Sequence, residues 1–424
     1  MFAARLAPFL ARLGIHYGWV MAGLTFLVML STAATMGSPG VFIEPLHAEF
    51  GWETGAISGP LGLRFALYGL IAPFAAALIM RYGVRAVVTT SALLIVVGLA
   101  ASTQMTALWQ LWATWGVLLG LAAGMTAMVL GATVASRWFT ARRGLVVGML
   151  TAANATGQLI MLPIAASIAT SHGWRYALIP AVSLLGLSLV LVLLFGADHP
   201  GNLNMAPYGE TAVVPPPPRS AAGAVRTSLA ALAEGSRSPL FWVLAFTFFI
   251  CGLSTGGLIQ SHFIPLCHDY GIPNVEAASI LAIIGAFDFV GTIASGWLSD
   301  RYDNRWLLFW YYGLRGISLI LLPYSGFSFV GLMIFGVFYG LDWVATVPPT
   351  VRLAAGGFGR EKAPLMFGWI FASHQIGSAF AVVAAGVSRD ALASYLPAFF
   401  VAGLACLLAS ALVIMLRRPA RATA

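Results

Sequence analysis

Charged residues are scarce in this chain of 424 residues. Asp, Glu, Lys and Arg together make up 8% of it, whereas hydrophobic residues make up 60%. Soluble domains carry about a quarter charged residues, so a soluble globular protein is excluded. We interpret the chain as an integral membrane protein, whose length can hold about a dozen spans of ~20 residues joined by short loops.

Cysteine is equally sparse. Cys251, Cys267 and Cys406 stand far apart, which excludes a disulfide framework and a zinc site with paired ligands. The sequence contains no Gly-x-x-x-x-Gly-Lys-Ser/Thr loop to hold phosphates, so ATP hydrolysis within the chain is not expected. A nucleophile with a base and an orienting partner is missing as well. We therefore predict that the protein is not an enzyme and that it binds no cofactor and no metal.

Long apolar runs bounded by charged or turn residues predict twelve membrane-spanning helices. The predicted spans are 17–42, 56–80, 86–104, 107–136, 143–170, 174–196, 239–265, 276–299, 305–323, 327–351, 363–388 and 395–416. The polar stretch between the sixth and seventh spans contains Pro215–Pro218, which cannot continue a helix and favours an extended linker. We therefore predict a six-helix bundle over 1–196, a cytoplasmic linker over 197–238 and a second six-helix bundle over 239–424.

The 22 basic residues are scattered through loops, so topology explains the net charge of +8 better than nucleic acid does. In the predicted topology, eighteen of them fall on the side of the amino terminus. Only Arg175 and Arg389 fall on the other side, and Arg64 and Arg315 fall inside spans. Because Lys and Arg accumulate on the cytoplasmic side, this bias predicts a multi-pass protein with both termini cytoplasmic, placed in a bacterial inner membrane.

A short charged hairpin occurs once in each half. The complete copy follows the pattern Gly-x-x-x-Asp-Arg-x-x-x-Arg, and the earlier copy keeps only part of it. The matching residues are Gly296, Asp300, Arg301 and Arg305 in the second half, and Arg81, Gly83 and Arg85 in the first, where Met80 and Ala76 replace the Asp and the Gly. This pattern, with six spans on either side of a linker, resembles the major facilitator superfamily of transporters. The resemblance implies alternating access around a central cavity, with the hairpins acting in the conformational change.

Two further stretches resemble the monocarboxylate-porter branch of that superfamily, which includes the oxalate-formate exchanger. One is Tyr17-Gly18-Trp19 at the start of the first span, and the other is Arg137–Gly148 entering the fifth. Relatives in this branch place an Asp and an Arg four residues apart on the eighth span. This chain has Asp288 but Thr292 at the Arg position, so the cation must come from elsewhere, from Arg315 or Arg64.

Ionisable side chains in the membrane are costly, so each is a candidate functional residue. Counting ~1.5 Å per residue from the cytoplasmic edge places Asp288 and His374 at a depth of ~18 Å and Arg315 and Asp342 at ~15 Å. Arg64 lies ~25 Å deep, in the outer half. Four groups therefore share a level near the midplane, where carriers of this kind bind their substrates.

Two interpretations of these charges remain open. Arg315 can neutralise Asp288 or Asp342 in a static pair that only keeps the half folded. Alternatively, one carboxyl exchanges a proton, because burial favours its neutral form and a nearby Arg favours its charged form. An Arg can also bind a substrate carboxylate in a bidentate fork. For Arg64, anion capture competes with a position at the external interface.

Polar residues at equivalent positions of the fifth and eleventh spans predict a shared cavity lining. Asn154 and Gln158 lie one helical turn apart on the fifth span, and His374 and Gln375 lie on the eleventh. Interhelical hydrogen bonding is the alternative role for each. Gly37–Gly40 and Val347–Pro349 interrupt the first and tenth spans, where bending or a fixed kink is expected.

We predict a secondary carrier for a small carboxylate, driven by protons and working by alternating access as a single chain in the bilayer. Arg64, Asn154, Gln158, Arg315 and His374 are the predicted substrate contacts, and Asp288 and Asp342 the predicted proton-coupling residues. Two alternatives stay open. One is a carrier or exporter of a larger, less polar compound, and the other is a membrane sensor or partner protein that transports nothing.

Overall fold

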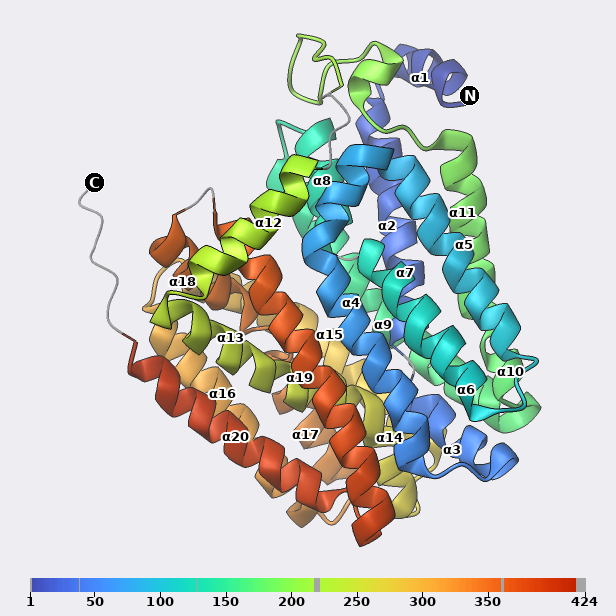
Figure 1. Ribbon diagram of the computed structural model, residues 1–424, viewed down its shortest axis with the longest axis vertical. Coiled ribbons are helices and arrows are strands. Elements are labelled where there is room, and N and C mark those ends of the chain that lie inside the picture. The colour runs from blue at the N-terminus through green and yellow to red at the C-terminus, as the bar shows by residue number, and fades with distance from the viewer. Residues whose placement is uncertain (1, 38, 127, 217–221, 360–361, 417–424) are drawn as a thin grey trace.

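The structure is a computed structural model that describes residues 2–37, 39–126, 128–216, 222–359 and 362–416. It is helical nearly throughout (Figure 1). Within these ranges the β structure is limited to one isolated bridge, between Phe139 and Tyr208. The all-helical fold class predicted from the apolar runs is confirmed.

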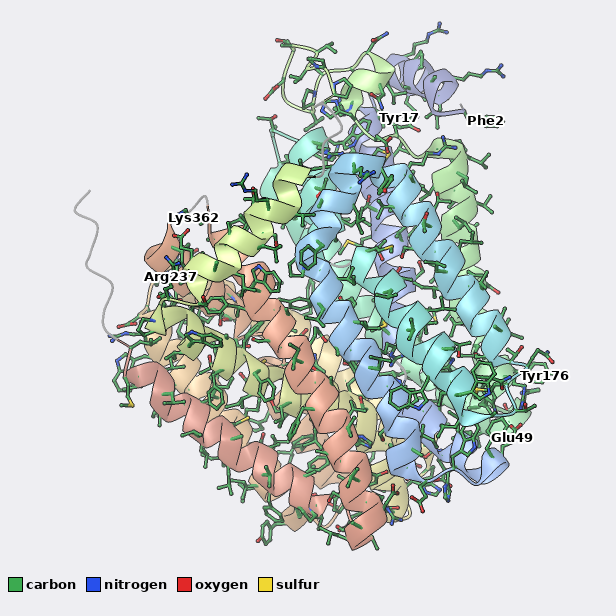
Figure 2. The ribbon with its side chains drawn as sticks, in the orientation of Figure 1. Phe2, Tyr17, Glu49, Tyr176, Arg237 and Lys362 are labelled. Carbon is green, nitrogen blue, oxygen red and sulfur yellow. The ribbon has the colours of Figure 1, made fainter. Side chains whose placement is uncertain are left out.

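The amino-terminal half places each predicted span on a helix or on a pair of helices in series. Its elements are α1 (Phe2–Arg12), α2 (Tyr17–Met36), α3 (Pro39–Phe50), α4 (Thr54–Tyr82), α5 (Val84–Ser102), α6 (Leu108–Leu111), η1 (Trp112–Leu119), α7 (Gly120–Met125), α8 (Met128–Trp138), α9 (Arg143–His172), α10 (Trp174–Ala177) and α11 (Ile179–Phe195). Glu49 and Tyr176 lie at the opposite end of this half from Phe2 and Tyr17, as the alternating spans require (Figure 2).

The carboxy-terminal half repeats the arrangement after a connecting segment. The connection holds η2 (Pro200–Leu203) and α12 (Ala222–Gly235). The half itself consists of α13 (Pro239–Gly252), η3 (Leu253–Ile259), α14 (Gln260–Asp269), α15 (Asn274–Ser299), α16 (Asn304–Leu321), η4 (Leu322–Ser325), α17 (Phe329–Asp342), α18 (Val347–Phe358), α19 (Ala363–Leu392) and α20 (Leu396–Ile414).

The lengths of these helices match a bilayer. In the described part of the chain, 11 helical segments are long and apolar enough to cross a membrane. They coincide with all the predicted spans except 143–170, which corresponds to α9. This helix has 30 residues, enough for about 45 Å at ~1.5 Å per residue. Together they make up the predicted twelve membrane helices in two six-helix bundles.

The first and tenth spans are broken where the sequence predicts interruptions. The first changes from α2 to α3 between Met36 and Pro39, and the tenth changes from α17 to α18 between Asp342 and Val347. A break at membrane depth leaves backbone carbonyls without helical partners, so other groups must satisfy them. A buried arginine does so at each break, as described below.

The connecting segment contains a helix that the sequence does not predict. Ala222–Gly235 forms α12, which lies across α4 and α19, whereas Pro217 and Pro218 of the predicted extended stretch lie outside the described residues (Figure 1). Ser228 Oγ donates to Pro73 O on α4 at 3.3 Å, and Trp369 Nε1 on α19 donates to Ser228 O at 2.9 Å. This helix therefore contacts both halves. The boundaries 1–196, 197–238 and 239–424 stay a prediction.

His199 gives the start of this connection a pH dependence. It is buried, and its Nδ1 accepts a hydrogen bond from Gly201 N at 3.1 Å. Burial and the neighbouring Arg137 guanidinium hold the pKa of His199 below its ordinary value of 6.5. The folded protein therefore binds this proton less readily than the unfolded chain. Stability should be fully present above about pH 6.5 and should be lost as the pH falls through the lowered pKa.

Replacing His199 with asparagine should remove this part of the acid dependence, because the amide keeps an acceptor but does not titrate. Thermal unfolding of the two proteins between about pH 7 and pH 5 is the measurement. An equal fall of the unfolding temperature in both proteins would contradict the assignment.

Candidate functional site

Arg64 is a buried guanidinium with no countercharge among the described residues. It lies on α4 with 1% of its surface exposed. Its Nη2 reaches Met36 O, the carbonyl at the α2–α3 break, at 3.4 Å, and its Nε is buried with no hydrogen-bond partner in the described ranges. Across the described residues no carboxylate forms an ion pair with it. The guanidinium thus keeps donors available for an anion.

Arg64 is buried because α4 packs closely against η1 and α7. Gly116, Gly120 and Gly124 follow one another at helical spacing on the face that meets α4. A Cβ added at Gly120 would lie 2.9 Å from Arg64 O, so only glycine allows the two helices this approach. The sequence shows these glycines but not which helix they face.

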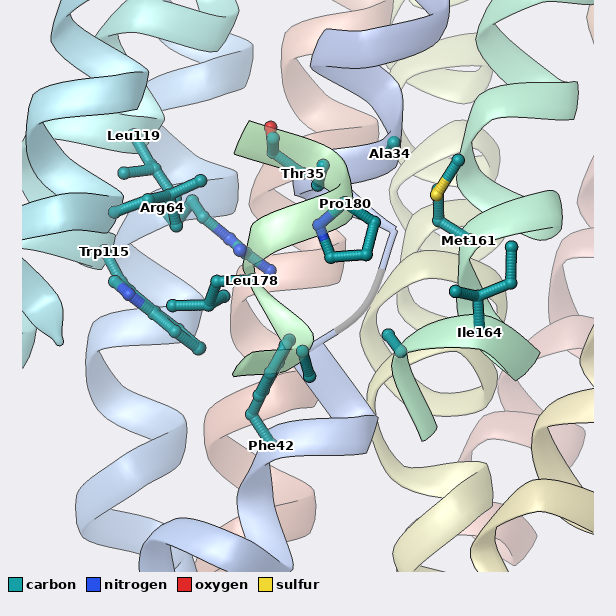
Figure 3. A pocket seen from close by; sticks show the side chains of 14 residues that line it. Ala34, Thr35, Phe42, Arg64, Trp115, Leu119, Met161, Ile164, Leu178 and Pro180 are labelled. Atoms are coloured by element: carbon teal, nitrogen blue, oxygen red, sulfur yellow. The ribbon is translucent and has the colours of Figure 1, made fainter. Parts of the chain in front are cut away.

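A small cavity of about 20 Å³ adjoins Arg64 (Figure 3). Its lining residues come from 34–181, so it lies within the amino-terminal half. The Arg64 side chain extends from α4 toward Pro180, between Thr35 and Leu178 (Figure 3). Apart from Arg64, the lining residues that the structure describes carry no charge.

Arg315 lies on α16 and has a full set of partners. Its Nε donates to Asp342 Oδ2 at 2.7 Å, in an ion pair whose Arg side chain is fully buried. Its Nη2 donates to the carbonyls of Asp342 and of Trp343, the latter at 3.1 Å, at the α17–α18 break. Its Nη1 donates to Cys251 Sγ at 3.0 Å. Of the two pairings left open by the sequence, the structure shows Arg315 with Asp342.

The two arginines are related in position. Arg64 serves the break in the first span, and Arg315 serves the break in the tenth. Arg315 forms an ion pair with Asp342, whereas Arg64 forms none with any carboxylate in the described part of the chain. The positive charge of Arg315 is therefore neutralised, and that of Arg64 is not neutralised by any described residue.

Asp288 on α15 is buried and bound by neutral donors. Its Oδ1 accepts hydrogen bonds from Thr292 Oγ1 at 2.9 Å and from Val344 N at 2.8 Å. It is 2% exposed, and it forms no ion pair with any residue whose placement is described. Thr292 therefore occupies the place of the missing arginine with a hydroxyl that donates to the same carboxyl.

His374 on α19 lies between aromatic rings. Its imidazole is 5.0 Å from the ring of Phe248 and is stacked at 5.9 Å on Phe371, measured between ring centroids. Its Nδ1 and Gln375 Oε1 are buried and have no hydrogen-bond partner within the described ranges. Gln375 Oε1 can accept a hydrogen bond from a ligand or a moving helix, and His374 Nδ1 can accept or donate one according to its tautomer. Asn154 and Gln158 lie on α9, but their side chains fall outside the described residues.

Cys251 is a site residue that the sequence did not reveal. The sequence favours a small apolar filler, but its sulfur accepts from Arg315 and lies 3.3 Å from Thr346 Oγ1. Only the geometry of α13, α16 and the α17–α18 break brings these groups together. Within the described part of the chain, no group of three His, Cys, Asp or Glu side chains is arranged to hold a metal.

The two hairpins make equivalent contacts. Arg305 Nη1 donates to Leu416 O just beyond α20, and Arg85 Nη2 donates to Leu193 O near the end of α11. Asp300 forms an ion pair with Arg352 on α18, whereas the corresponding Met80 is 42% exposed.

The first arginine of each hairpin motif lies over a neighbouring aromatic ring: Arg301 over Trp297 and Arg81 over Tyr82. Gly83 has a positive φ of 87°. Gly296 lies on α15, and an added Cβ would contact nothing within 4 Å.

Twelve membrane helices in two related halves, with buried charges beside breaks in the helices, are typical of a secondary membrane transporter. A family model described as "Major Facilitator Superfamily" matches residues 21–346 and 263–424. The chain belongs to the Major Facilitator Superfamily, and it is a membrane transporter of that type rather than an enzyme.

Individual relatives agree with this family. The chain is 25% identical to the uncharacterized MFS-type transporter YcxA of Bacillus subtilis over 390 residues, covering 89% of this chain and 90% of that one. It is 27% identical to monocarboxylate transporter 13 of Rattus norvegicus over 404 residues, with 94% and 89% covered. The crystal structure of a D-xylose-proton symporter superposes with a TM-score of 0.72 at 14% identity, covering 95% and 98%, which shows the shared fold alone.

Proposed function

We propose that the protein is a secondary carrier that moves a small, monocarboxylate-like organic anion by alternating access, coupled to protons. It acts in the bacterial inner membrane with both termini cytoplasmic, as the distribution of basic residues favours. The similarity to a monocarboxylate transporter is consistent with this substrate class. The observation that carries the proposal is the buried guanidinium of Arg64, which forms no ion pair with any residue that the structure describes.

Burying a charge without a partner costs free energy, and a ligand of opposite charge recovers part of that free energy when it binds. The free Nε of Arg64 and the long contact from Nη2 to Met36 O leave donors for a carboxylate. Arg can bind both oxygens of a carboxylate at once. Arg64 is therefore our proposed anion site, with Asn154, Gln158 and His374 as further polar contacts along the path.

The proton-responsive groups in this proposal are Asp288 and Asp342. Asp288 exchanges the proton directly, because its hydrogen bonds come from the neutral donors Thr292 Oγ1 and Val344 N and it forms no ion pair among the residues described. Asp342 responds through its pair with Arg315, which also satisfies the carbonyls at the α17–α18 break. Movement of that break changes the distance between Arg315 and the carboxyl, and this links proton binding to the conformation. Arg315 thus acts through Asp342 and becomes a substrate contact only when that pair opens.

Replacing Arg64 with glutamine tests the proposal. Loss of a charge-assisted, bidentate contact should raise the half-saturating concentration of a transported monocarboxylate at least about tenfold. Uptake of labelled pyruvate, lactate and longer monocarboxylates into proteoliposomes, with and without an inward proton gradient, is the measurement. Arg64→Lys keeps the charge but not the fork, and it should give an intermediate value.

Two results would contradict the proposal. One is saturable uptake that is unchanged in Arg64→Gln. The other is uptake by the unaltered protein that depends neither on the proton gradient nor on the anion. Absence of flux for every solute tested would favour a membrane sensor or partner protein.

A further inference from the structure

The helix α1 precedes the first span and presents a different kind of residue on each of its sides. Phe2, Phe9 and Leu13, at the end of the helix, recur at intervals of seven and four residues, so they share one side. More than half of each of these side chains is exposed. Ala3 and Ala7, four residues apart, lie on a second side, which is buried. The exposed apolar side is therefore not the one that packs against the protein.

Two arginines border this apolar side. Arg5 and Arg12 are seven residues apart, which is nearly two helical turns, so they lie together on one flank of α1. Both are exposed, and neither forms an ion pair with a residue that the structure describes. Aromatic and leucine side chains on one side, with arginines beside them, are typical of a helix that lies in the surface of a membrane.

The rest of the protein holds α1 in a fixed direction. The helix lies across the end of the amino-terminal half, where it contacts α2 and α11 (Figure 1). The chain leaves it through Gly14, whose positive φ of 73° favours glycine, and Ile15 N donates to Leu10 O at 3.0 Å. A hydrogen bond of 3.0 Å between His16 Nε2 and Ala206 O fixes the following residues. The apolar side of α1 therefore has a set orientation.

The apolar side adjoins the lipid-facing surface of the sixth span. The Phe2 ring meets the Phe195 ring at the end of α11 edge to face, with centroids 6.5 Å apart. Of the 11 candidate spans in the described part of the chain, Trp174–Phe195 is the least buried. Leu187 and Val190 are exposed on one side of it. The apolar side of α1 thus continues a surface that the acyl chains of a bilayer cover.

We propose that α1 binds anionic phospholipid at the membrane surface, with Phe2, Phe9 and Leu13 among the acyl chains and with Arg5 and Arg12 at the headgroup phosphates. This is the surface that we propose to be cytoplasmic. The inference goes beyond the proposed function, because it does not depend on which solute is carried. Each arginine should favour an anionic over a zwitterionic neighbour by about fivefold.

The first test reads lipid contact on the full chain in lipid nanodiscs. An apolar fluorophore is attached to Phe9→Cys or to Ala11→Cys, which lies two residues further on, exposed on the opposite side of α1. The native cysteines Cys251, Cys267 and Cys406 are buried and do not compete for the label. Phosphatidylcholine with brominated acyl chains should quench the label at position 9 strongly and the label at position 11 weakly.

Bromine on one lipid at a time then measures the headgroup preference. At equal mole fraction, brominated phosphatidylglycerol should quench the label at position 9 as if it were at least about fivefold more concentrated than brominated phosphatidylcholine. Arg5→Gln with Arg12→Gln should remove this preference and keep the quenching by phosphatidylcholine, because the apolar side is intact. Arg5→Lys with Arg12→Lys should keep both, since the charge is retained.

Three results would overturn the inference. They are equal quenching at positions 9 and 11, equal quenching by the two brominated lipids when both arginines are present, and a preference for phosphatidylglycerol that survives the double glutamine variant. A second copy of the chain covering the apolar side would also overturn it. That copy would shield position 9 from bromine and would give energy transfer between chains labelled there.

Discussion

Replacing Arg315 with glutamine should lower the free energy of unfolding by about 3–5 kcal/mol. The variant leaves Asp342 as a buried carboxylate without its cation, and it removes the donors to the carbonyls of Asp342 and Trp343. Those carbonyls belong to the break between α17 and α18, where no helical hydrogen bond can replace the lost contact. Unfolding of the purified chain by denaturant in mixed micelles is the measurement.

Arg301→Gln is the matched control for this experiment. Arg301 is exposed, its guanidinium stacks on Trp297 at 4.1 Å, and it contacts the carbonyl of the same residue at 3.2 Å. Surface substitutions of this kind change stability by about 0.5 kcal/mol or less. If Arg315→Gln is no more destabilising than Arg301→Gln, the buried pair does not hold this half together.

The double variant Arg315→Leu with Asp342→Leu distinguishes the role of the ion pair in stability from its proposed role in proton coupling. Removing both charges avoids an unpaired buried group, so this variant should recover much of the stability lost in Arg315→Gln. We expect it to fold and to lose the dependence of uptake on the proton gradient. Full gradient-driven uptake by the double variant would mean that the pair is structural only.

The fold was largely predictable because its signals lie along the chain. Apolar length sets the spans, basic residues mark their ends, and Gly37–Gly40 and Val347–Pro349 mark the breaks in two helices. The helix α12 was not predicted. Its stability depends on contacts with α4 and α19, and the nearby prolines favour an extended chain over the residues before it.

The sequence predicted the membrane depth of the buried ionisable residues but not which of them form an ion pair. Counting residues from the hairpins placed Asp288, Arg315 and Asp342 at one level. Which carboxyl meets Arg315 depends on how α15, α16 and α17 are rotated about their axes, and span patterns do not specify this rotation. Cys251 was missed for the same reason, because a single cysteine in an apolar run has no sequence signal of its partner.

A seam of glycines between α4 and α19 controls how closely the two halves approach. Gly55, Gly62 and Gly69 recur every seven residues, which is nearly two helical turns, so they share one face of α4. A Cβ added at Gly62 would lie 2.7 Å from Val383 Cγ2 and 3.0 Å from Ala379 O. Side chains larger than hydrogen cannot fit here unless the helices separate.

The seam ends in a hydrogen-bonded contact between the halves. Asp390 near the end of α19 accepts from Thr54 N at 3.1 Å and from Gly55 N at 2.6 Å, at the first turn of α4. A carboxylate at a helix amino terminus satisfies free N–H groups and is favoured by the helix dipole. This end, which we propose to be the external one, is therefore closed in the structure.

Gly62→Leu should abolish net transport by preventing this closure. The larger side chain pushes α4 away from α19 and removes the state that the structure shows, whereas binding from the opposite conformation remains. The readout is a cysteine placed at Ser58, which is fully buried in the seam and whose Oγ would lie 2.4 Å from a Cβ at Gly386. An impermeant thiol reagent should label Ser58→Cys slowly in the unaltered background and rapidly with Gly62→Leu.

The native cysteines do not obscure this measurement, because Cys251, Cys267 and Cys406 are all buried. Gly186→Leu on α11 is the matched control, since a Cβ added at Gly186 meets nothing within 4 Å. It should transport normally and keep Ser58→Cys protected. If Gly62→Leu also transports normally, or leaves Ser58→Cys protected, then close approach of α4 and α19 is not required in the transport cycle.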